Sequence, residues 1–166
     1  AASDVYKRQA YGSGNKEEGA KVLFESLWIG ISLGLLTTAA VWIYGEDIIG
    51  LFGLDNQSKI LAINYLKFSM LFSAMFSASF IFGAALRAAG DAKTPLAIMI
   101  FQNIINVFLL IGLVNGSFGL PNLGVIGAAL AWGISFTVGT FICFFLWLTK
   151  LTIIPVPIFN SFNLKR

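Results

Sequence analysis

Residues 95–114, PLAIMIFQNIINVFLLIGLV, form an uncharged run long enough to cross a membrane. An α-helix needs about 20 mainly apolar residues to span the hydrocarbon core of a bilayer. Backbone amides in hydrocarbon need partners inside the protein, and the sequence has no strand-length segments of alternating polarity, so this run is predicted to be a helix and not a barrel strand. The predicted class is therefore all-α.

Three further apolar runs extend this prediction, at about 22–44, 60–86 and 125–148. Hydrophobic residues make up 57% of the chain and charged residues 11%, whereas a soluble domain has about 25% charged residues. Water is a poor solvent for such a surface, and lipid is the expected partner. We predict a polytopic membrane bundle with four transmembrane helices over residues 10–150.

Lysine and arginine, which cytoplasmic loops retain, fall in three places on one side of the predicted bundle. These residues are Lys16, Lys21, Arg87, Lys93, Lys150, Lys165 and Arg166. The first loop on the other side is mainly acidic and the second is uncharged. We therefore predict a multi-pass protein of the cell inner (plasma) membrane with both ends of this chain cytoplasmic. The basic residues form no patch interleaved with aromatics, so no nucleic-acid partner is expected.

The segments outside the four runs have separate predictions. Residues 1–9, AASDVYKRQ, resemble translated adapter sequence and are predicted to be a non-native leader, and 151–166 are predicted to be a cytoplasmic linker. The loop 45–59 mixes apolar, acidic and glycine residues, which suits a short amphipathic helix at the outer interface. Asp55 or Ser58 is expected to cap the helix that follows.

Enzymatic chemistry has little support in this composition. The chain has no histidine and one cysteine, Cys143, which lies inside an apolar run. Histidine, the usual general base and a usual zinc ligand, is therefore missing, and a single cysteine cannot form a cysteine metal site within the chain. The spans contain no paired catalytic groups, so we expect no enzyme, no cofactor and no metal site.

Three carboxamides, Gln102, Asn103 and Asn106, lie in the middle of the run 95–114. Their three- and four-residue spacing places Asn106 on a shared face with each of the others. Carboxamides at this depth need hydrogen-bond partners, which neighbouring helices, water or a translocated solute could supply. Helix packing and pathway lining both fit, and the three residues are candidates for a substrate or ion pathway.

The loop between the second and third runs, ALRAAGDAKTP, has the composition of a well-formed turn. Gly90 permits the turn, Thr94 is expected to cap the next helix, and Pro95 suits its first position. Arg87 and Asp91 belong to a partly compensated charge cluster in the same loop.

This loop also resembles a known family. LRAAGDAKTP, residues 86–95, looks like the Leu-Arg-Gly-x-Gly-Asp-x-x-Thr-Pro loop of the multidrug and toxic compound extrusion (MATE) family. QAYGSGN at 9–15, NIIN at 103–106 and FGLPNLGVIGAALAWGIS at 118–135 resemble further family segments in the same order, so the resemblance covers residues 9 to about 150. The motif residues it singles out are Arg87, Gly90, Asp91, Thr94, Pro95, Gly119, Pro121, Gly124 and Gly127.

The resemblance implies helices three to six of a twelve-helix, two-lobe transporter, in the amino-terminal lobe. Such a protein would be a secondary active antiporter that exports drugs, organic cations or other small amphipathic compounds in exchange for Na⁺ or H⁺ as coupling ion. Its partners would be lipid, the remaining helices and those substrates. Leu110 stands where some members hold an acidic residue, and Trp132 stands where threonine is common. The resemblance therefore places the coupling group elsewhere, on the first or seventh helix.

Two alternatives remain at this point. A lipid-linked or polysaccharide flippase has a related fold, but it would favour a basic, anion-binding cavity, and Arg87 and Lys93 lie in a loop. A non-transporting membrane assembly subunit would leave the family motifs unexplained.

Overall fold

The computed structural model describes residues 16–149, and every regular element in this part of the chain is an α-helix. The helices are α2 (Lys16–Gly50), α3 (Asn56–Met70), α4 (Ser73–Ala88), α5 (Lys93–Asn115) and α6 (Gly124–Leu148). By length and hydropathy α2, α5 and α6 can each cross a membrane, and α3 with α4 make a fourth span if the bent pair is one crossing. The prediction of an all-α membrane bundle is confirmed. The leader and linker predicted at 1–9 and 151–166 lie outside the described residues.

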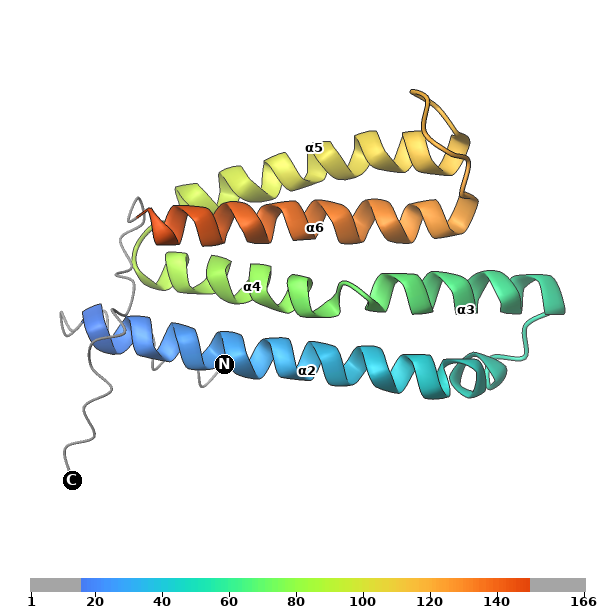
Figure 1. The fold of residues 1–166 in the computed structure, drawn as a ribbon, viewed down its shortest axis with the longest axis horizontal. Helices are drawn as coiled ribbons and strands as arrows, with labels where there is room; N and C mark the ends of the chain where they lie inside the picture. Colours follow the sequence, from blue (N-terminus) through green and yellow to red (C-terminus); the bar gives the residue numbers. More distant parts are fainter. Residues whose placement is uncertain (1–15, 150–166) are drawn as a thin grey trace.

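Helix α6 occupies the centre of the bundle. It contacts α3, α4 and α5, whereas α2 packs on α3 and α4. Figure 1 shows α5 on one side of α6, and the row formed by α3 and α4 on the other, with α2 beyond that row. The apolar span of α6 is 39% buried, against 17% for α2 and 22% for α5. Most of the apolar surface of α2 and α5 therefore faces outward, where lipid or further helices would cover it.

A buried hydrophobic cluster holds four of the helices together at the end of the bundle where α4 connects to α5. Its members are Ala20, Leu23 and Leu27 of α2, Ala78, Phe82, Ala85 and Leu86 of α4, Ile98 of α5, and Cys143 and Trp147 of α6. The rings of Phe82 and Trp147 meet edge to face at 5.8 Å. Small side chains in this set let the helices approach closely.

The second span is broken, although the sequence predicted a single helix over 60–86. Helices α3 and α4 meet at an angle of 51°. Hydroxyl groups hold the break: Thr38 of α2 bonds to the carbonyl oxygen of Met70, and its Oγ1 lies 3.0 Å from Ser73 Oγ. Ser73 Oγ in turn donates to Gly34 O at 2.6 Å. Carbonyl groups freed by a break need such partners in a membrane, so the side chains of α2 stabilise the bend.

Two glycines allow neighbouring helices to reach this break. A Cβ on Gly34 would lie 2.6 Å from the backbone of Ala74, so α2 and α4 are in direct backbone contact there. On the other side, the ring of Phe72 occupies the space that a Cβ on Gly133 of α6 would need. The bend is therefore built into the packing of three helices.

The loop predicted to hold a short amphipathic helix at 45–59 has no helix of its own: residues 45–50 continue α2, and residues 56–59 form the first turn of α3. Figure 1 shows these last turns directed away from the main axis of α2. Asp55 caps α3 and accepts hydrogen bonds from the backbone amides of Gln57 and Ser58, at 3.1 Å each. An ion pair of 2.8 Å between Lys67 and Glu46 ties α3 to the end of α2.

Candidate functional site

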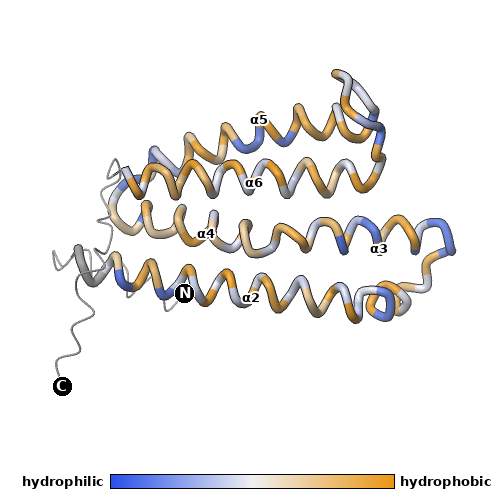
Figure 2. The backbone as a smooth tube through the Cα atoms, viewed as in Figure 1, coloured by the Kyte–Doolittle hydropathy of each residue, from blue (hydrophilic) through white to orange (hydrophobic). Residues whose placement is uncertain are grey.

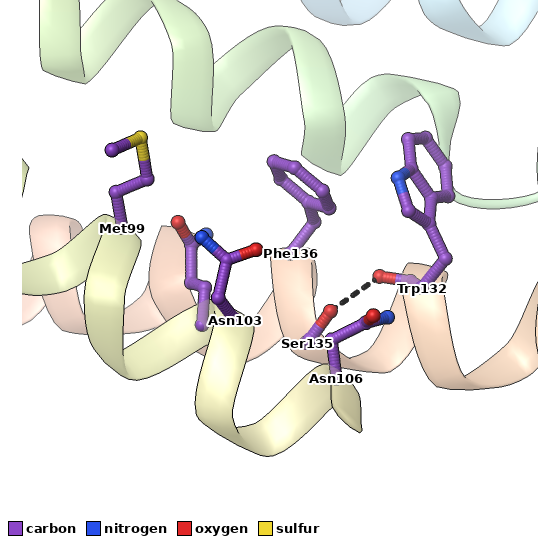
Figure 3. Close-up of a pocket in the computed structure, with 7 residues that line it drawn as sticks. Met99, Asn103, Asn106, Trp132, Ser135 and Phe136 are labelled. Carbon is purple, nitrogen blue, oxygen red and sulfur yellow. Dashed lines mark hydrogen bonds between the residues drawn. The ribbon is translucent and has the colours of Figure 1, made fainter. Parts of the chain in front are cut away.

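A cavity of about 180 Å³ lies between α5 and α6, near the middle of both helices. Its lining residues are Met99, Gln102, Asn103 and Asn106 of α5, with Trp132, Ser135 and Phe136 of α6. Figure 2 shows that hydrophilic residues interrupt α5 in its middle, and Figure 3 shows Met99, Phe136 and Trp132 projecting from α5 and α6 toward α4. The three carboxamides singled out from the sequence therefore meet at one cavity. Their role in a pathway stays a prediction.

Gln102 is the most buried of the three amides, with 6% of its surface exposed. Its Nε2 donates to Ser79 Oγ of α4 at 3.2 Å. Its side chain also occupies the space that a Cβ on Gly139 of α6 would need. Gln102 therefore connects three helices, which is the interhelical hydrogen bonding that a polar residue in a bundle is expected to make.

Asn103 and Asn106 differ from Gln102 in having no side-chain hydrogen-bond partner among the described residues. Asn103 is exposed and Asn106 is half-buried, so both amide groups are open to the cavity. In hydrocarbon an unpaired amide costs several kcal/mol, on the order of the penalty for transfer out of water. These two side chains are therefore the ones available to a solute, to water or to a further helix.

Aromatic rings form the wall of the cavity on α6. The ring centroids of Trp132 and Phe136 are 5.0 Å apart, and Phe76 of α4 lies 5.2 Å from the first and 5.1 Å from the second. Ser135 Oγ donates to the carbonyl oxygen of Trp132 at 2.8 Å, so its hydroxyl is used within its own helix. Figure 3 shows the two α6 rings standing on the same side of that helix.

The chemistry of the cavity is that of hydrogen bonds and ring faces. None of its seven lining residues is charged. Among the described residues, no group of three histidine, cysteine, aspartate or glutamate side chains could hold a metal ion. The cavity therefore offers amide donors and acceptors beside an aromatic surface.

The start of α5, after the loop from α4, is capped by a different residue from the one expected. Asp91 Oδ1 accepts from the backbone amides of Lys93 at 3.1 Å and Thr94 at 2.9 Å, whereas the Thr94 side chain caps nothing at the start of α5. The side chain and backbone amide of Thr94, followed by the amide of Lys93, lower the pKa of the Asp91 carboxyl. Pro95 is the third residue of α5 and not the first, a position where the missing N–H still costs nothing.

The other motif residues of this loop shape the connection between α4 and α5. Gly90 has a φ of +91°, which favours glycine. The guanidinium of Arg87 lies over Gly83, one turn earlier in α4, with Pro95 also beside that glycine. Figure 1 shows this loop at the same end of the bundle as the start of α2.

The loop between α5 and α6 places its motif residues around the turn from one helix to the other. Gly119 and Gly124 have positive φ values of 77° and 52°, and Pro121 is exposed between them. Gly127 lies against the backbone of Leu113, where a Cβ would come within 2.5 Å of the carbonyl oxygen. The loop motif therefore sets how closely α6 approaches α5, and with it the width of the cavity.

Five residues of this site are not identified from the sequence as site residues: Ser79, Met99, Trp132, Ser135 and Phe136. Trp132 was noted only as a departure from the family pattern. The α6 residues recur at three- and four-residue spacing and include two aromatics and a hydroxyl, which is a signal of a shared face. Ser79 gave no comparable signal, because its role depends on which helix lies beside α5.

Comparisons with known proteins agree with this architecture. The MatE family model matches residues 1–111. A probable multidrug resistance protein NorM from Thermotoga maritima is 34% identical over 131 residues, which cover 78% of this chain and 28% of that protein. A probable multidrug resistance protein YoeA from Bacillus subtilis is 34% identical over 152 residues, covering 90% of this chain and 32% of that protein.

A solved structure has the same fold. It is an inward-facing conformation of a multidrug resistance MATE family transporter, and it matches with a TM-score of 0.82 at 21% identity, over 93% of this chain and 34% of that one. The chain thus spans about a third of the length of the relatives it matches. Because the family model covers more than half of the 166 residues, this chain belongs to the MatE family of multidrug and toxic compound extrusion proteins.

Proposed function

We propose that this chain forms helices three to six, in the amino-terminal lobe, of a transporter that exports drugs or organic cations in exchange for Na⁺ or H⁺. The cavity between α5 and α6 then lies on the substrate or ion pathway. The names of the NorM and YoeA relatives, both multidrug resistance proteins, support this class of substrate.

The proposal rests on the side-chain amides of Asn103 and Asn106 at the cavity, which are unpaired within the described part of the chain. Both lie at the middle of a membrane-length helix, both line the cavity, and neither has a side-chain partner among residues 19–149. A purely structural amide would be expected to bond to a neighbouring helix, as Gln102 does to Ser79. Open amides at this depth are the arrangement that a polar pathway requires.

The coupling ion needs a group that this cavity does not contain. An antiporter requires a site whose ionisation or occupancy changes the balance between its conformations. The seven lining residues include no carboxylate, and Leu110 occupies the position where some family members carry one. We therefore assign Na⁺ or H⁺ binding to the first or seventh helix of the complete transporter.

Orientation in the inner membrane follows from the charges at the two ends of the bundle. Arg87 and Lys93 lie at one end, where Figure 1 also places the start of α2 and the end of α6. The acidic Glu46, Asp47 and Asp55 lie toward the other end. The distribution of lysine and arginine supports a cytoplasmic location for the first end.

The two alternatives fit the cavity less well. A lipid-linked or polysaccharide flippase handles anionic headgroups, and a cavity for them would present arginine or lysine, whereas the lining here is uncharged. An assembly subunit that does not transport would leave the match to the MatE family unexplained. The drug or cation exporter is the function that the site supports best.

The test is Asn106→Ala in a full-length transporter that contains this segment. We expect a loss of about three- to tenfold in dye export and drug resistance, the size of one hydrogen bond, with an unchanged level in the membrane. Asn64→Ala is the matched control, because Asn64 lies on α3 away from the cavity lining. Export equal to that of the unmodified protein would remove Asn106 from the pathway.

A further inference from the structure

We propose that Trp132 determines the specificity of the cavity, and that the cavity takes flat aromatic or heteroaromatic compounds whether or not they carry a positive charge. This inference rests on the proposed function, since it names the substrate class of the same site. It is carried by the ring geometry on α6, by the open amides on α5 and by the lack of charge in the lining.

Trp132 belongs to a compact group of three rings. Its centroid lies 5.2 Å from that of Phe76 and 5.0 Å from that of Phe136, and the last two are 5.1 Å apart. An indole has few rotatable bonds, and the neighbouring rings restrict it further, so it offers a large surface without a large loss of side-chain entropy on binding. A flat ligand could stack on such a surface.

The opposite wall supplies hydrogen bonds at the edge of such a ligand. Asn103 and Asn106 each present one acceptor and two donors, and neither has a partner among the described residues. A carboxamide pairs well with a heteroaromatic edge that carries a donor beside an acceptor. The cavity therefore combines a surface for the face of a ring with groups for its edge.

The described lining contributes no charge to this recognition. No lining residue is ionisable, so a bound cation gains no counter-ion from the described lining and interacts only with ring faces and amide oxygens. Neutral and cationic forms of one ring system should therefore bind within about tenfold of each other. A cation without a flat ring loses the stacking surface altogether.

The experiment measures binding to the purified full-length transporter in lipid nanodiscs at pH 8. The probes are phenanthridine, which is neutral, N-methylphenanthridinium, which has the same rings and a fixed charge, and tetrapropylammonium, which is not flat. The variants are Trp132→Leu and Trp132→Phe. Trp28→Leu is the matched control, because Trp28 lies on the outward face of α2 with 61% of its surface exposed.

We expect Trp132→Leu to weaken both flat probes by about tenfold, Trp132→Phe to weaken them less, and Trp28→Leu to leave them unchanged. Tetrapropylammonium affinity should not depend on residue 132. The inference is overturned if Trp132→Leu binds the flat probes as the unmodified protein does. It is also overturned if the unmodified protein prefers the charged probe by more than about tenfold, a measurement that does not depend on whether any variant folds.

A transport assay distinguishes a failure of this inference from a failure of the proposed transport function. Proteoliposomes that bind the flat probes through Trp132 but export no drug or organic cation would contradict the proposed function and leave the ligand class standing. Export that continues with the same substrate profile in Trp132→Leu would contradict the inference and leave the function standing.

Discussion

Gln102 of α5 occupies the space directly above Gly139 of α6, so that a Cβ on this glycine would overlap the side-chain amide. The missing side chain allows Gln102 to pass α6 and bond to Ser79 of α4. One glycine thus permits a polar contact between two helices that have few other contacts with each other. The position of the cavity residues on either side of Gln102 depends on this close approach.

Gly139→Ala should therefore destabilise the bundle. The new methyl group has to displace Gln102, and overpacking of this kind costs about 1–3 kcal/mol. We expect a lower thermal unfolding temperature of the full-length transporter in detergent. Gly45→Ala is the matched control, since a Cβ there would meet only ordinary contacts at 3.5 and 3.8 Å. Equal unfolding temperatures for the two variants would show that Gln102 moves aside without cost.

The helix break explains why part of the fold could not be predicted. The long uncharged runs identify membrane helices because lipid leaves the backbone few alternatives. The residues around 71 and 72 include neither proline nor glycine, and the serines at 69 and 73 are only a weak local signal of a bend. Its causes are Thr38 and Gly34, more than 30 residues earlier, and their effect depends on the packing of α2 against α4.

The candidate site, like the fold, could be predicted only in part from the sequence. Spacing placed Gln102, Asn103 and Asn106 on neighbouring faces of one helix, but it could not distinguish the amide with a partner from the two without. That distinction requires knowing that Ser79 lies opposite Gln102. Trp132 likewise becomes a lining residue only once α6 is known to pack beside α5.

Thr38→Val tests the hydroxyl contacts that hold the break between α3 and α4. The substitution keeps the shape of the side chain but removes its bond to Met70 O and the approach of its hydroxyl to Ser73 Oγ. Interhelical hydrogen bonds in membrane proteins contribute about 0.6 kcal/mol on average and up to about 1.7 kcal/mol. We expect a loss of stability in this range when unfolding is followed in mixed micelles.

Thr37→Val provides the control for that measurement. Thr37 is exposed, and its hydroxyl bonds only to Leu33 O, one turn earlier in its own helix, at 2.7 Å. Valine at this position should change stability by less than at position 38. The same loss at both positions would mean that the threonine hydroxyls act through α2 itself and not through the break.

Asp91 should stabilise the start of α5 in a way that depends on pH. The pKa of its carboxyl is lowered in the folded protein by Thr94 and by the amide of Lys93, so its contribution is present above its unfolded pKa, about 4. The contribution is lost as the pH falls through the lower folded value. Stability of the unmodified protein should therefore not change between pH 6 and 8 on account of this group.

Asp91→Ala removes the same contacts at all pH values, at a cost of about 1 kcal/mol, typical of a helix cap. Hydrogen exchange at the backbone amides of Lys93 and Thr94 would measure the effect locally. We expect faster exchange in the variant at pH 7, and a smaller difference from the unmodified protein below pH 4. Identical exchange at pH 7 would show that the carboxylate does not cap α5.

Cysteine labelling tests the orientation proposed from the charges. Single cysteines replacing Lys93, the first residue of α5, and Ser117, in the loop after it, should react with a membrane-impermeant maleimide from opposite sides, because the two residues lie at opposite ends of α5. Cys143 is buried and is replaced by alanine to remove background reactivity. Lys93→Cys should be labelled in inverted vesicles and Ser117→Cys in intact cells. Labelling of both from one side would contradict the topology, and exchange of the two sides would invert the orientation inferred from lysine and arginine.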